Sequence, residues 1–303
     1  MNTPVTPVWQ HYASAIASGF LGDWLEQRRN PLALSMSLLE HGQPLDPARP
    51  EPANPGSVIY LSIHGLMELE SVFTFPGKPG EHYGSMLAER LDQPVTSLAL
   101  RYNTGRPIYR NGEDLAGVLE QLVANWPVPV EKIVVLGHSM GGLLIRSACH
   151  YGELQGHKWL SSLDSCIYVG SPHDGSWLAR GAKSLAGMTR KMPRDYLRVV
   201  GEVIDIRSEG IRNLSRGDIL AEQGKDAPLV PGVRHFVVCG LLGRSRSNPL
   251  NALFGDALVH ESSARGQERD GWSLAGMATF PGIDHIRLAH HPDVGRQLVE
   301  WLV

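Results

Sequence analysis

The sequence has little of what marks several large classes of protein. Its three cysteines, Cys149, Cys166 and Cys239, are too few and too scattered for a disulfide framework or a C-x-x-C metal site. The 28 basic and 31 acidic residues nearly balance, with a net charge of −3, so bulk charge does not favour nucleic-acid binding. No run approaches the length of about 18 consecutive apolar residues that a membrane-spanning helix needs, so we expect no transmembrane segment.

Signals for targeting, metals and nucleotides are also missing. The first thirty residues lack a basic region followed by an apolar stretch and a small-residue cleavage site, so we expect a cytoplasmic protein. Neither a P-loop nor an H-E-x-x-H pair occurs, so we expect no cofactor and no metal. The composition of the chain is that of a globular protein. With 303 residues, 42 % of them hydrophobic and 19 % charged, the chain can bury an extensive core in two domains or in one large α/β domain.

Residues 1–56 differ in pattern from the rest of the chain. Apolar side chains recur at three- and four-residue steps from Trp9 to Trp24, which predicts an amphipathic helix, and residues 32–39 offer a second short helical run. Five prolines between 41 and 56 predict an extended connector. We therefore predict a helical arm, whose apolar stripe packs against the core or against a second subunit in a homodimer.

Residues 57–303 form the predicted main domain, in which short apolar runs alternate with helical stretches. This alternation is typical of an α/β fold, with a mostly parallel central sheet and helices on both faces. The interval between the fourth and fifth strands is far longer than an ordinary loop, and we assign residues 176–232 to a helical cap insertion. The predicted strands are 58–63, 95–100, 132–136, 166–170, 235–239 and 277–281, and the first two predicted helices of this domain are 113–126 and 140–150.

The most informative stretch is G-H-S-M-G-G at 137–142, which lies between a predicted buried strand and an apolar helix. A serine hydroxyl is a weak nucleophile, and a sharp strand-to-helix turn exposes it beside a base and a helix N-terminus. Bulky side chains at Gly137 and Gly141 would collide with neighbouring backbone in such a turn. Ser139 is therefore the predicted nucleophile; a glycine-rich turn with an incidental serine is the alternative. His138 points away from its neighbour and is interpreted as supporting.

A second stretch strengthens this interpretation, because G-S-P-H-D-G-S at 170–176 resembles the G-T-P-H-x-G-S stretch of triacylglycerol lipases and inositol-deacylase-like proteins. Together with the elbow at Ser139, it gives a resemblance to serine esterases and lipases of the α/β-hydrolase superfamily over residues 57–303. The resemblance implies an α/β-hydrolase catalytic domain that uses a Ser-His-Asp triad.

In this fold, backbone N–H groups stabilise the negative charge that acyl transfer builds on the carbonyl oxygen. One donor is the residue after the nucleophile, here Met140, at a helix N-terminus whose dipole also helps. The second comes from the loop after an earlier strand, where His64-Gly65-Leu66 resembles the H-G-x element of lipases, so Leu66 would donate. His64 is predicted to be a substrate-binding residue, and it is expected to order the loop rather than to transfer protons.

The order of the triad in this fold is serine, acid, histidine. His285 lies between the last predicted strand and the closing helix, where the fold delivers its base, and we predict that it is the base. His290 and His291 abut Pro292 and are expected to start that helix; His260 is a further rival.

For the acid we predict Asp256, in a G-D-x-x-V element that resembles the one carrying the acid in related lipases. Asp174 and Asp284 are rivals. Asp284 is too close in sequence to orient the ring of its neighbour, and Asp174 is expected to cap a helix.

In the cap, a stripe that includes Leu185 and Met188 is predicted to line the acyl pocket. The predicted function is hydrolysis of a small-molecule or lipid ester through an acyl-enzyme. An acyltransferase with the same triad, or a catalytically silent binding protein, is the alternative.

Overall fold

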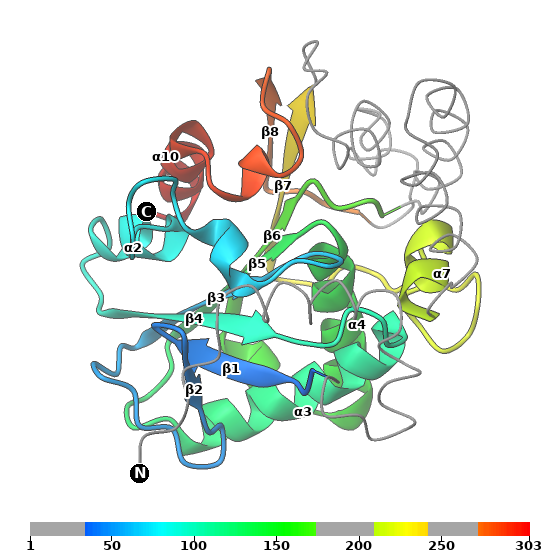
Figure 1. The fold of residues 1–303 in the computed structure, drawn as a ribbon. Coiled ribbons are helices and arrows are strands. Elements are labelled where there is room, and N and C mark those ends of the chain that lie inside the picture. The colour runs from blue at the N-terminus through cyan, green and yellow to red at the C-terminus, as the bar shows by residue number, and fades with distance from the viewer. Residues whose placement is uncertain (1–33, 174–208, 242–271) are drawn as a thin grey trace.

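The computed structural model describes residues 34–173, 209–241 and 272–303 (Figure 1). Within these ranges eight strands form one sheet in the order β2-β1-β4-β3-β5-β6-β7-β8. The strands are β1 (Ser37–Glu40), β2 (Gln43–Leu45), β3 (Val58–Ile63), β4 (Val95–Arg101), β5 (Lys132–His138), β6 (Leu163–Val169), β7 (Arg234–Leu241) and β8 (Gly276–Pro281). The α-helices are α2 (Tyr83–Ala88), α3 (Ile108–Asn125), α4 (Met140–Gln155), α7 (Glu209–Arg216) and α10 (Pro292–Leu302), with short 3-10 turns at Glu70–Phe73, Lys158–Ser162 and Arg287–Ala289.

The sheet is parallel from β4 through β8, and β1 pairs antiparallel with both β2 and β4. Each of the six strands predicted from the sequence is present, and the expected α/β class with a mostly parallel sheet is confirmed. Parallel strands need crossover connections, which here are largely helical, so both faces of the sheet become covered.

Two hydrophobic cores lie on opposite faces of this sheet. Alternate residues of the strands, such as Ile59 and Leu61 of β3, pack with α3, α4 and α7 on one face. The intervening residues, such as Tyr60 of β3 and Ile167 of β6, pack with α2 and α10 on the other. Figure 1 shows α2 beside α10 and α3 beside α4. Because both faces are covered, the central strands are buried along almost their whole length.

The helical run expected at residues 32–39 is wrong over residues 37–39, which belong to the strand β1. The reason is a two-residue hairpin turn, in which His41 and Gly42 both have positive φ, 48° and 76°. Such a turn matches the twist of paired strands, and it brings β2 back against β1. Part of the segment assigned to the arm and connector is therefore the edge of the main sheet. The predicted amphipathic helix lies in residues 1–33, outside the described residues.

The helix α3 begins five residues before its predicted start at 113. Asn213 supplies the reason, because its buried Oδ1 accepts a hydrogen bond of 3.1 Å from the backbone N–H of Ile108. This side chain, more than one hundred residues away in the sequence, satisfies a donor at the first turn, where a helix leaves its N–H groups unpaired. A pattern of nearby residues does not contain that contact.

The sequence assigns residues 209–232 to the end of the cap insertion, but apolar residues of this segment are buried in the core that contains α3 and α4. Leu214 and Ile219 have no exposed surface. Ser147 of α4 donates a 2.7 Å hydrogen bond to the carbonyl oxygen of Ile219, and Arg146 donates one of 2.5 Å to that of Ala227. This part of the predicted insertion therefore packs against α4. The rest of it, residues 176–208, lies outside the described residues.

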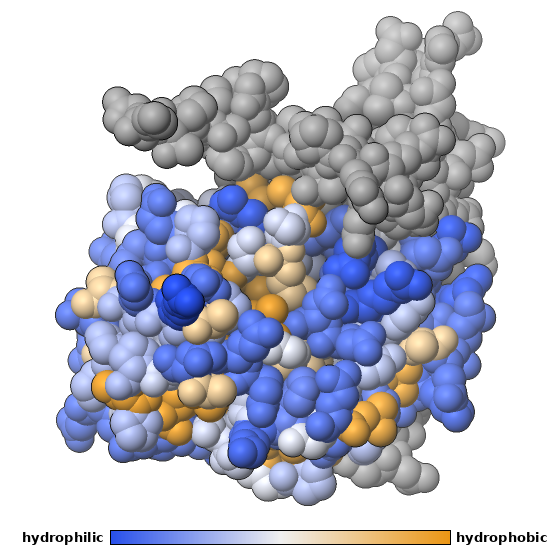
Figure 2. Space-filling view, turned by 90° about the horizontal axis from the view of Figure 1, so that it is seen from below, coloured by the Kyte–Doolittle hydropathy of each residue, from blue (hydrophilic) through white to orange (hydrophobic). Residues whose placement is uncertain are grey.

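The face that Figure 2 shows is mostly hydrophilic in its described part, with hydrophobic residues among the hydrophilic ones, several of them toward its middle. Among the described residues, the exposed large hydrophobic side chains are Leu154, Met277 and Val303. No helix in the described ranges is long and apolar enough to cross a membrane.

We predict that residues 209–232 contribute to global stability as core does. Leu214→Ala and Ile219→Ala should each lower the free energy of unfolding by about 2–5 kcal/mol, because each removes buried methyl groups and leaves a cavity. Leu154→Ala is the matched control, since Leu154 is 69 % exposed, and it should change stability by no more than about 0.5 kcal/mol. Urea denaturation measures all three. Equal stability of the three variants would mean that this segment does not belong to the core.

Candidate functional site

The candidate site lies where β3, β5 and β6 end at the same edge of the sheet. The chain passes from β3 outward to β4 and then returns to the other side of β3 as β5, so the direction of winding reverses between β3 and β5. In open α/β sheets, ligands bind in the crevice outside the carboxyl ends of the strands at such a switch point. The loops at this edge begin at His64, Ser139 and Gly170.

Ser139 occupies the turn between β5 and α4 in a strained backbone conformation. Its φ is 54° and its ψ is −121°, in a region that residues with a side chain rarely adopt. It is the N-cap of α4, so its hydroxyl lies at the positive end of the helix dipole. Its backbone N–H donates a 2.9 Å hydrogen bond to the carbonyl oxygen of Val169, which holds the turn to the end of β6. The backbone therefore makes the sharp strand-to-helix turn that the sequence predicts, and the role of Ser139 as nucleophile stays a prediction.

Glycines make this turn sterically feasible, as the sequence predicts. A Cβ at Gly137 would lie 2.4 Å from the backbone carbon of Gly141, and one at Gly141 would lie 2.3 Å from the carbonyl oxygen of Ile63. A Cβ at Gly142 would meet Ser171 Oγ at 2.0 Å. The elbow is therefore wedged between the ends of β3 and β6, and any side chain at these positions would push it away from its neighbours.

The loop after β3 passes directly beside Ser139. A Cβ at Gly65 would lie 2.8 Å from Ser139 Cβ, so the backbone that leads to Leu66 is in close contact with the elbow. Both predicted oxyanion donors, Leu66 and Met140, have buried side chains in the core that contains α3 and α4. The structure thus brings the two residues into the same region, and the role of their N–H groups stays a prediction.

His64 stabilises this loop from inside the protein. Its ring is fully buried and stacks on Tyr102 with 4.7 Å between centroids. Its Nδ1 lies 2.9 Å from the carbonyl oxygen of Gly65, and Tyr102 Oη donates to the backbone oxygen of His64 at 2.9 Å. Burial lowers the pKa of His64, so a neutral ring that donates from Nδ1 fits these contacts. These contacts order the loop, and contact of His64 with substrate stays a prediction.

His285 is brought to the same edge from the loop between β8 and α10. Its ring packs so closely on Gly170 that a Cβ there would lie 2.9 Å from Nδ1. The ring of His138 lies 4.6 Å away, between centroids. Burial, followed by the charge of His138, lowers the pKa of His285 to about 3 against the opposing effect of Glu68. The ring is therefore a neutral imidazole near pH 7, and its role as the base stays a prediction.

The sequence does not single out Glu68, and it marks His138 only as supporting. The structure joins the two: His138 Nδ1 lies 2.8 Å from Glu68 Oε2, and His138 has no exposed surface. Nothing distinguishes Glu68 from the nearby Glu70 in the sequence. A signal does exist for His138, because it ends a buried strand, and a buried histidine needs polar partners.

The rival residues occupy other positions. Asp284 Oδ1 accepts the backbone N–H of Arg287 at 3.0 Å, which caps a local turn. His291 is the N-cap of α10, as predicted, and His290 Nδ1 lies 2.7 Å from the carbonyl oxygen of Val72. The remaining predicted site residues and rivals, Asp256, Leu185, Met188, Asp174 and His260, lie outside the described residues.

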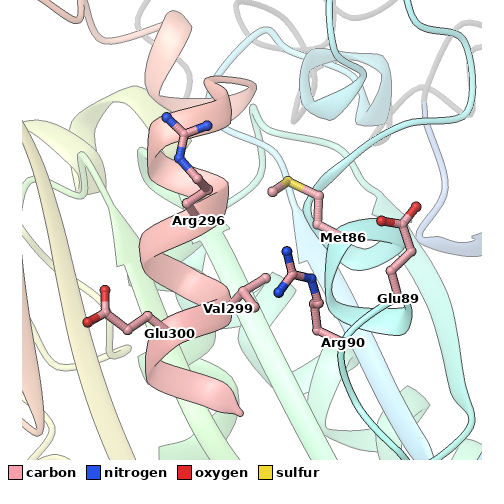
Figure 3. Close-up of a pocket in the computed structure, with 6 residues that line it drawn as sticks. All are labelled: Met86, Glu89, Arg90, Arg296, Val299 and Glu300. Carbon is pink, nitrogen blue, oxygen red and sulfur yellow. The ribbon is translucent and has the colours of Figure 1, made fainter.

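A separate cavity of about 300 Å³ lies between α2 and α10 (Figure 3). Arg296, Val299 and Glu300 line it from α10. The other lining residues are Met86, Glu89 and Arg90, at the end of α2 and just beyond it. None of these belongs to the loops after β3, β5 and β6, so we do not assign the cavity to the candidate site. In the described ranges, no group of three histidine, cysteine or acidic side chains is placed to hold a metal ion.

Comparison with solved structures agrees with this architecture. The RedJ thioesterase of the prodiginine pathway in Streptomyces coelicolor is 16 % identical, with a TM-score of 0.50 over 83 % of this chain and 94 % of that one. Esterase B from Lactobacillus rhamnosis is 14 % identical, with a TM-score of 0.47 over 96 % and 94 % of the two chains. At these identities the likeness concerns the fold alone. The chain has the α/β-hydrolase fold.

Part of the sequence also matches a known protein family. Residues 114–195, which include the elbow, match the family described as the PGAP1-like alpha/beta domain. The predicted resemblance to proteins of the α/β-hydrolase fold is therefore confirmed. No curated protein matches the chain.

We predict that the packing around the elbow tolerates no added methyl group. Gly141→Ala should lower the free energy of unfolding by at least about 1–3 kcal/mol, because the new Cβ must displace the backbone of β3. Gly117→Ala in α3 is the control, since a Cβ there has open space, and it should raise stability by about 0.5–1 kcal/mol. Thermal and urea denaturation of both variants test this. Equal stabilities would contradict the tight packing of the elbow.

Proposed function

We propose that this protein is a serine hydrolase that cleaves a carboxylic ester, with Ser139 as nucleophile, His285 as base and Asp256 as the orienting acid. The observation that carries the proposal is the strained backbone of Ser139 at the start of α4, with φ of 54°. Strain of this kind persists only where the surrounding structure enforces it, and it is concentrated at functional sites. The packing of His285 on Gly170, at the same edge of the sheet, supports the choice of base.

The chemistry follows from these roles. Ser139 Oγ attacks the ester carbonyl carbon while His285 takes the hydroxyl proton, and the carbonyl oxygen becomes an oxyanion. The N–H groups of Leu66 and Met140 stabilise that charge. When the intermediate collapses, His285 returns the proton to the leaving alcohol and the acyl group stays on Ser139. Water, activated by His285, then releases the carboxylic acid and restores the serine.

The proposed substrate is a small-molecule or lipid ester with an apolar acyl or alcohol part, and the proposed setting is the cytoplasm. The apolar stripe that the sequence predicts at Leu185 and Met188 supports the apolar preference, because burial of a Leu or Met side chain contributes about 1.5–3 kcal/mol. A panel of p-nitrophenyl esters from acetate to palmitate measures the chain-length preference directly.

We predict that Ser139→Ala lowers kcat on p-nitrophenyl butyrate by at least about 10³-fold, because the alanine cannot form the acyl-enzyme. A fluorophosphonate probe followed by peptide mass spectrometry should find its adduct on Ser139 of the wild type. Ser161→Ala is the control, since Ser161 is an exposed serine that hydrogen-bonds Lys158, and this variant should keep full activity and labelling. Turnover by the Ser139→Ala variant, or an adduct on another serine, would contradict the assignment.

The acid is tested by two isosteric substitutions. Asp256→Asn should lower kcat far more than it lowers stability, because the amide cannot hold the imidazole in the required tautomer or stabilise the imidazolium. Asp174→Asn should leave kcat within about threefold of the wild type, in keeping with a capping role worth about 0.5–2 kcal/mol. Melting temperatures measured beside the kinetics separate the two effects. The opposite pattern would transfer the role of the acid to Asp174.

A further inference from the structure

A buried ion pair lies beneath the elbow, outside the set of reacting groups. Glu68 comes from the loop after β3, and His138 is the last residue of β5. Their facing atoms are 2.8 Å apart; the His138 side chain has no exposed surface and that of Glu68 is 13 % exposed. A buried ion pair carries a large desolvation cost, and further hydrogen bonds are needed to offset it. Those hydrogen bonds indicate what the pair does.

The contacts of the pair join three segments of the site: the loop after β3, the end of β5 and the loop between β8 and α10. Glu68 Oε2 also accepts the backbone N–H of Gly65 at 2.7 Å, one residue before the proposed oxyanion donor Leu66. His138 Nε2 lies 2.9 Å from the carbonyl oxygen of His285. One side-chain pair therefore connects the loop after β3, the residue before the nucleophile and the backbone of the proposed base.

The hydrogen-bond partners define the protonation state of the pair. A carbonyl oxygen can only accept, so Nε2 of His138 must carry a proton toward His285. A carboxylate likewise accepts, so Nδ1 carries a proton toward Glu68. Burial alone would lower the pKa of His138, but the Glu68 carboxylate raises it overall. Burial alone would raise the pKa of Glu68, but His138 lowers it overall. The pair is an imidazolium and a carboxylate.

We propose that Glu68 and His138 are positioning residues for the reaction proposed above: Glu68 orients the loop that carries Leu66, and His138 holds the backbone of His285 against the elbow. Neither side chain exchanges a proton or an electron pair with the substrate. The proposal rests on the proposed function, and it adds two residues whose effect on the rate passes through the geometry of others.

Three substitutions of similar shape each remove part of this connection. In Glu68→Gln the carboxylate charge is gone and His138 is expected to be neutral, with a single N–H. It can then donate either to the new amide oxygen or to the carbonyl oxygen of His285, but not to both. One of the three hydrogen bonds must therefore be lost. His138→Gln can still donate to the carbonyl oxygen of His285, but it removes the cation beside Glu68. His138→Asn is too short to reach that oxygen and retains only the side toward Glu68.

The control is His235→Gln, in β7. His235 is also buried, with Nδ1 3.0 Å from Tyr168 Oη and Nε2 3.2 Å from the carbonyl oxygen of Val230. Through these hydrogen bonds His235 contacts none of the three segments that Glu68 and His138 join. This variant should lose stability as the others do, because it disturbs the core. It should keep kcat within about threefold of the wild type, because it leaves the reacting groups in place, whereas a displacement of about 1 Å would lower the rate strongly.

The experiment measures kcat, KM and melting temperature on p-nitrophenyl butyrate. We expect Glu68→Gln and His138→Asn each to lower kcat by about 10²-fold with little change in KM, since a displacement of about 1 Å can cost that much. The double variant Glu68→Gln/His138→Asn should lose about as much as either single variant, because residues in one network are not additive. If Glu68→Gln does not fold, Glu68→Asp, which keeps the charge, should fold with a smaller fall in kcat.

The pH dependence of kcat/KM distinguishes a positioning role from a purely structural one, because a loss of stability alone would not shift it. Glu68 and His138 both act electrostatically on His285. In His138→Gln the imidazolium is gone, so protonation of His285 becomes easier, and the acidic limb of kcat/KM should move to higher pH. A limb that stays in place would contradict the proposed arrangement.

Failure of this proposal is distinguishable from failure of the proposed function. If Ser139→Ala is inactive while Glu68→Gln and His138→Asn match the wild type or His235→Gln, the hydrolase stands and the positioning role is overturned. If the wild type neither hydrolyses the ester nor reacts with the fluorophosphonate, the function fails and this proposal fails with it.

Discussion

The backbone contact between the elbow and the two adjacent strands is the constraint on which the rest of the site depends. Ser139 keeps its positive φ because the glycines on either side let the turn press against the carbonyl oxygen of Ile63 and the end of β6. A backbone held this closely on two sides cannot relax into an ordinary helix start. The cost of the strained residue, of order 1–3 kcal/mol, is offset by the packing of the sheet around it.

The order of the strands determines what this constraint can bring together. Because the winding reverses between β3 and β5, the loops that begin at His64 and Ser139 become neighbours at one edge, and β6 adds Gly170 beside them. His285 then reaches this edge from the loop after β8 and packs on Gly170, where a larger residue would leave it no room. The site is thus built from four segments that are far apart in the sequence.

The charged pair beneath the elbow illustrates the same principle with electrostatics. Glu68 and His138 are separated by seventy residues, yet their side chains meet in the core and share hydrogen bonds with Gly65 and His285. Burying an ion pair carries a desolvation cost, and further hydrogen bonds to the two charged groups help to offset it. The pair therefore requires its loops to hold one arrangement, and a displaced loop would leave a charged group with too few hydrogen bonds.

The sequence by itself determined the six parallel strands and the elbow, because local signals specify both. Buried strands read as β-branched apolar runs, and the glycines at 137, 141 and 142 are required by the backbone of the turn itself. Only the tertiary structure decided that β1 and β2 extend the sheet, that α3 begins at Ile108 under Asn213, and that residues 209–232 belong to the core. It alone paired Glu68 with His138. Each of these depends on a contact between distant residues, and the free energy of such a contact outweighs the weak local preference of the segments that it joins.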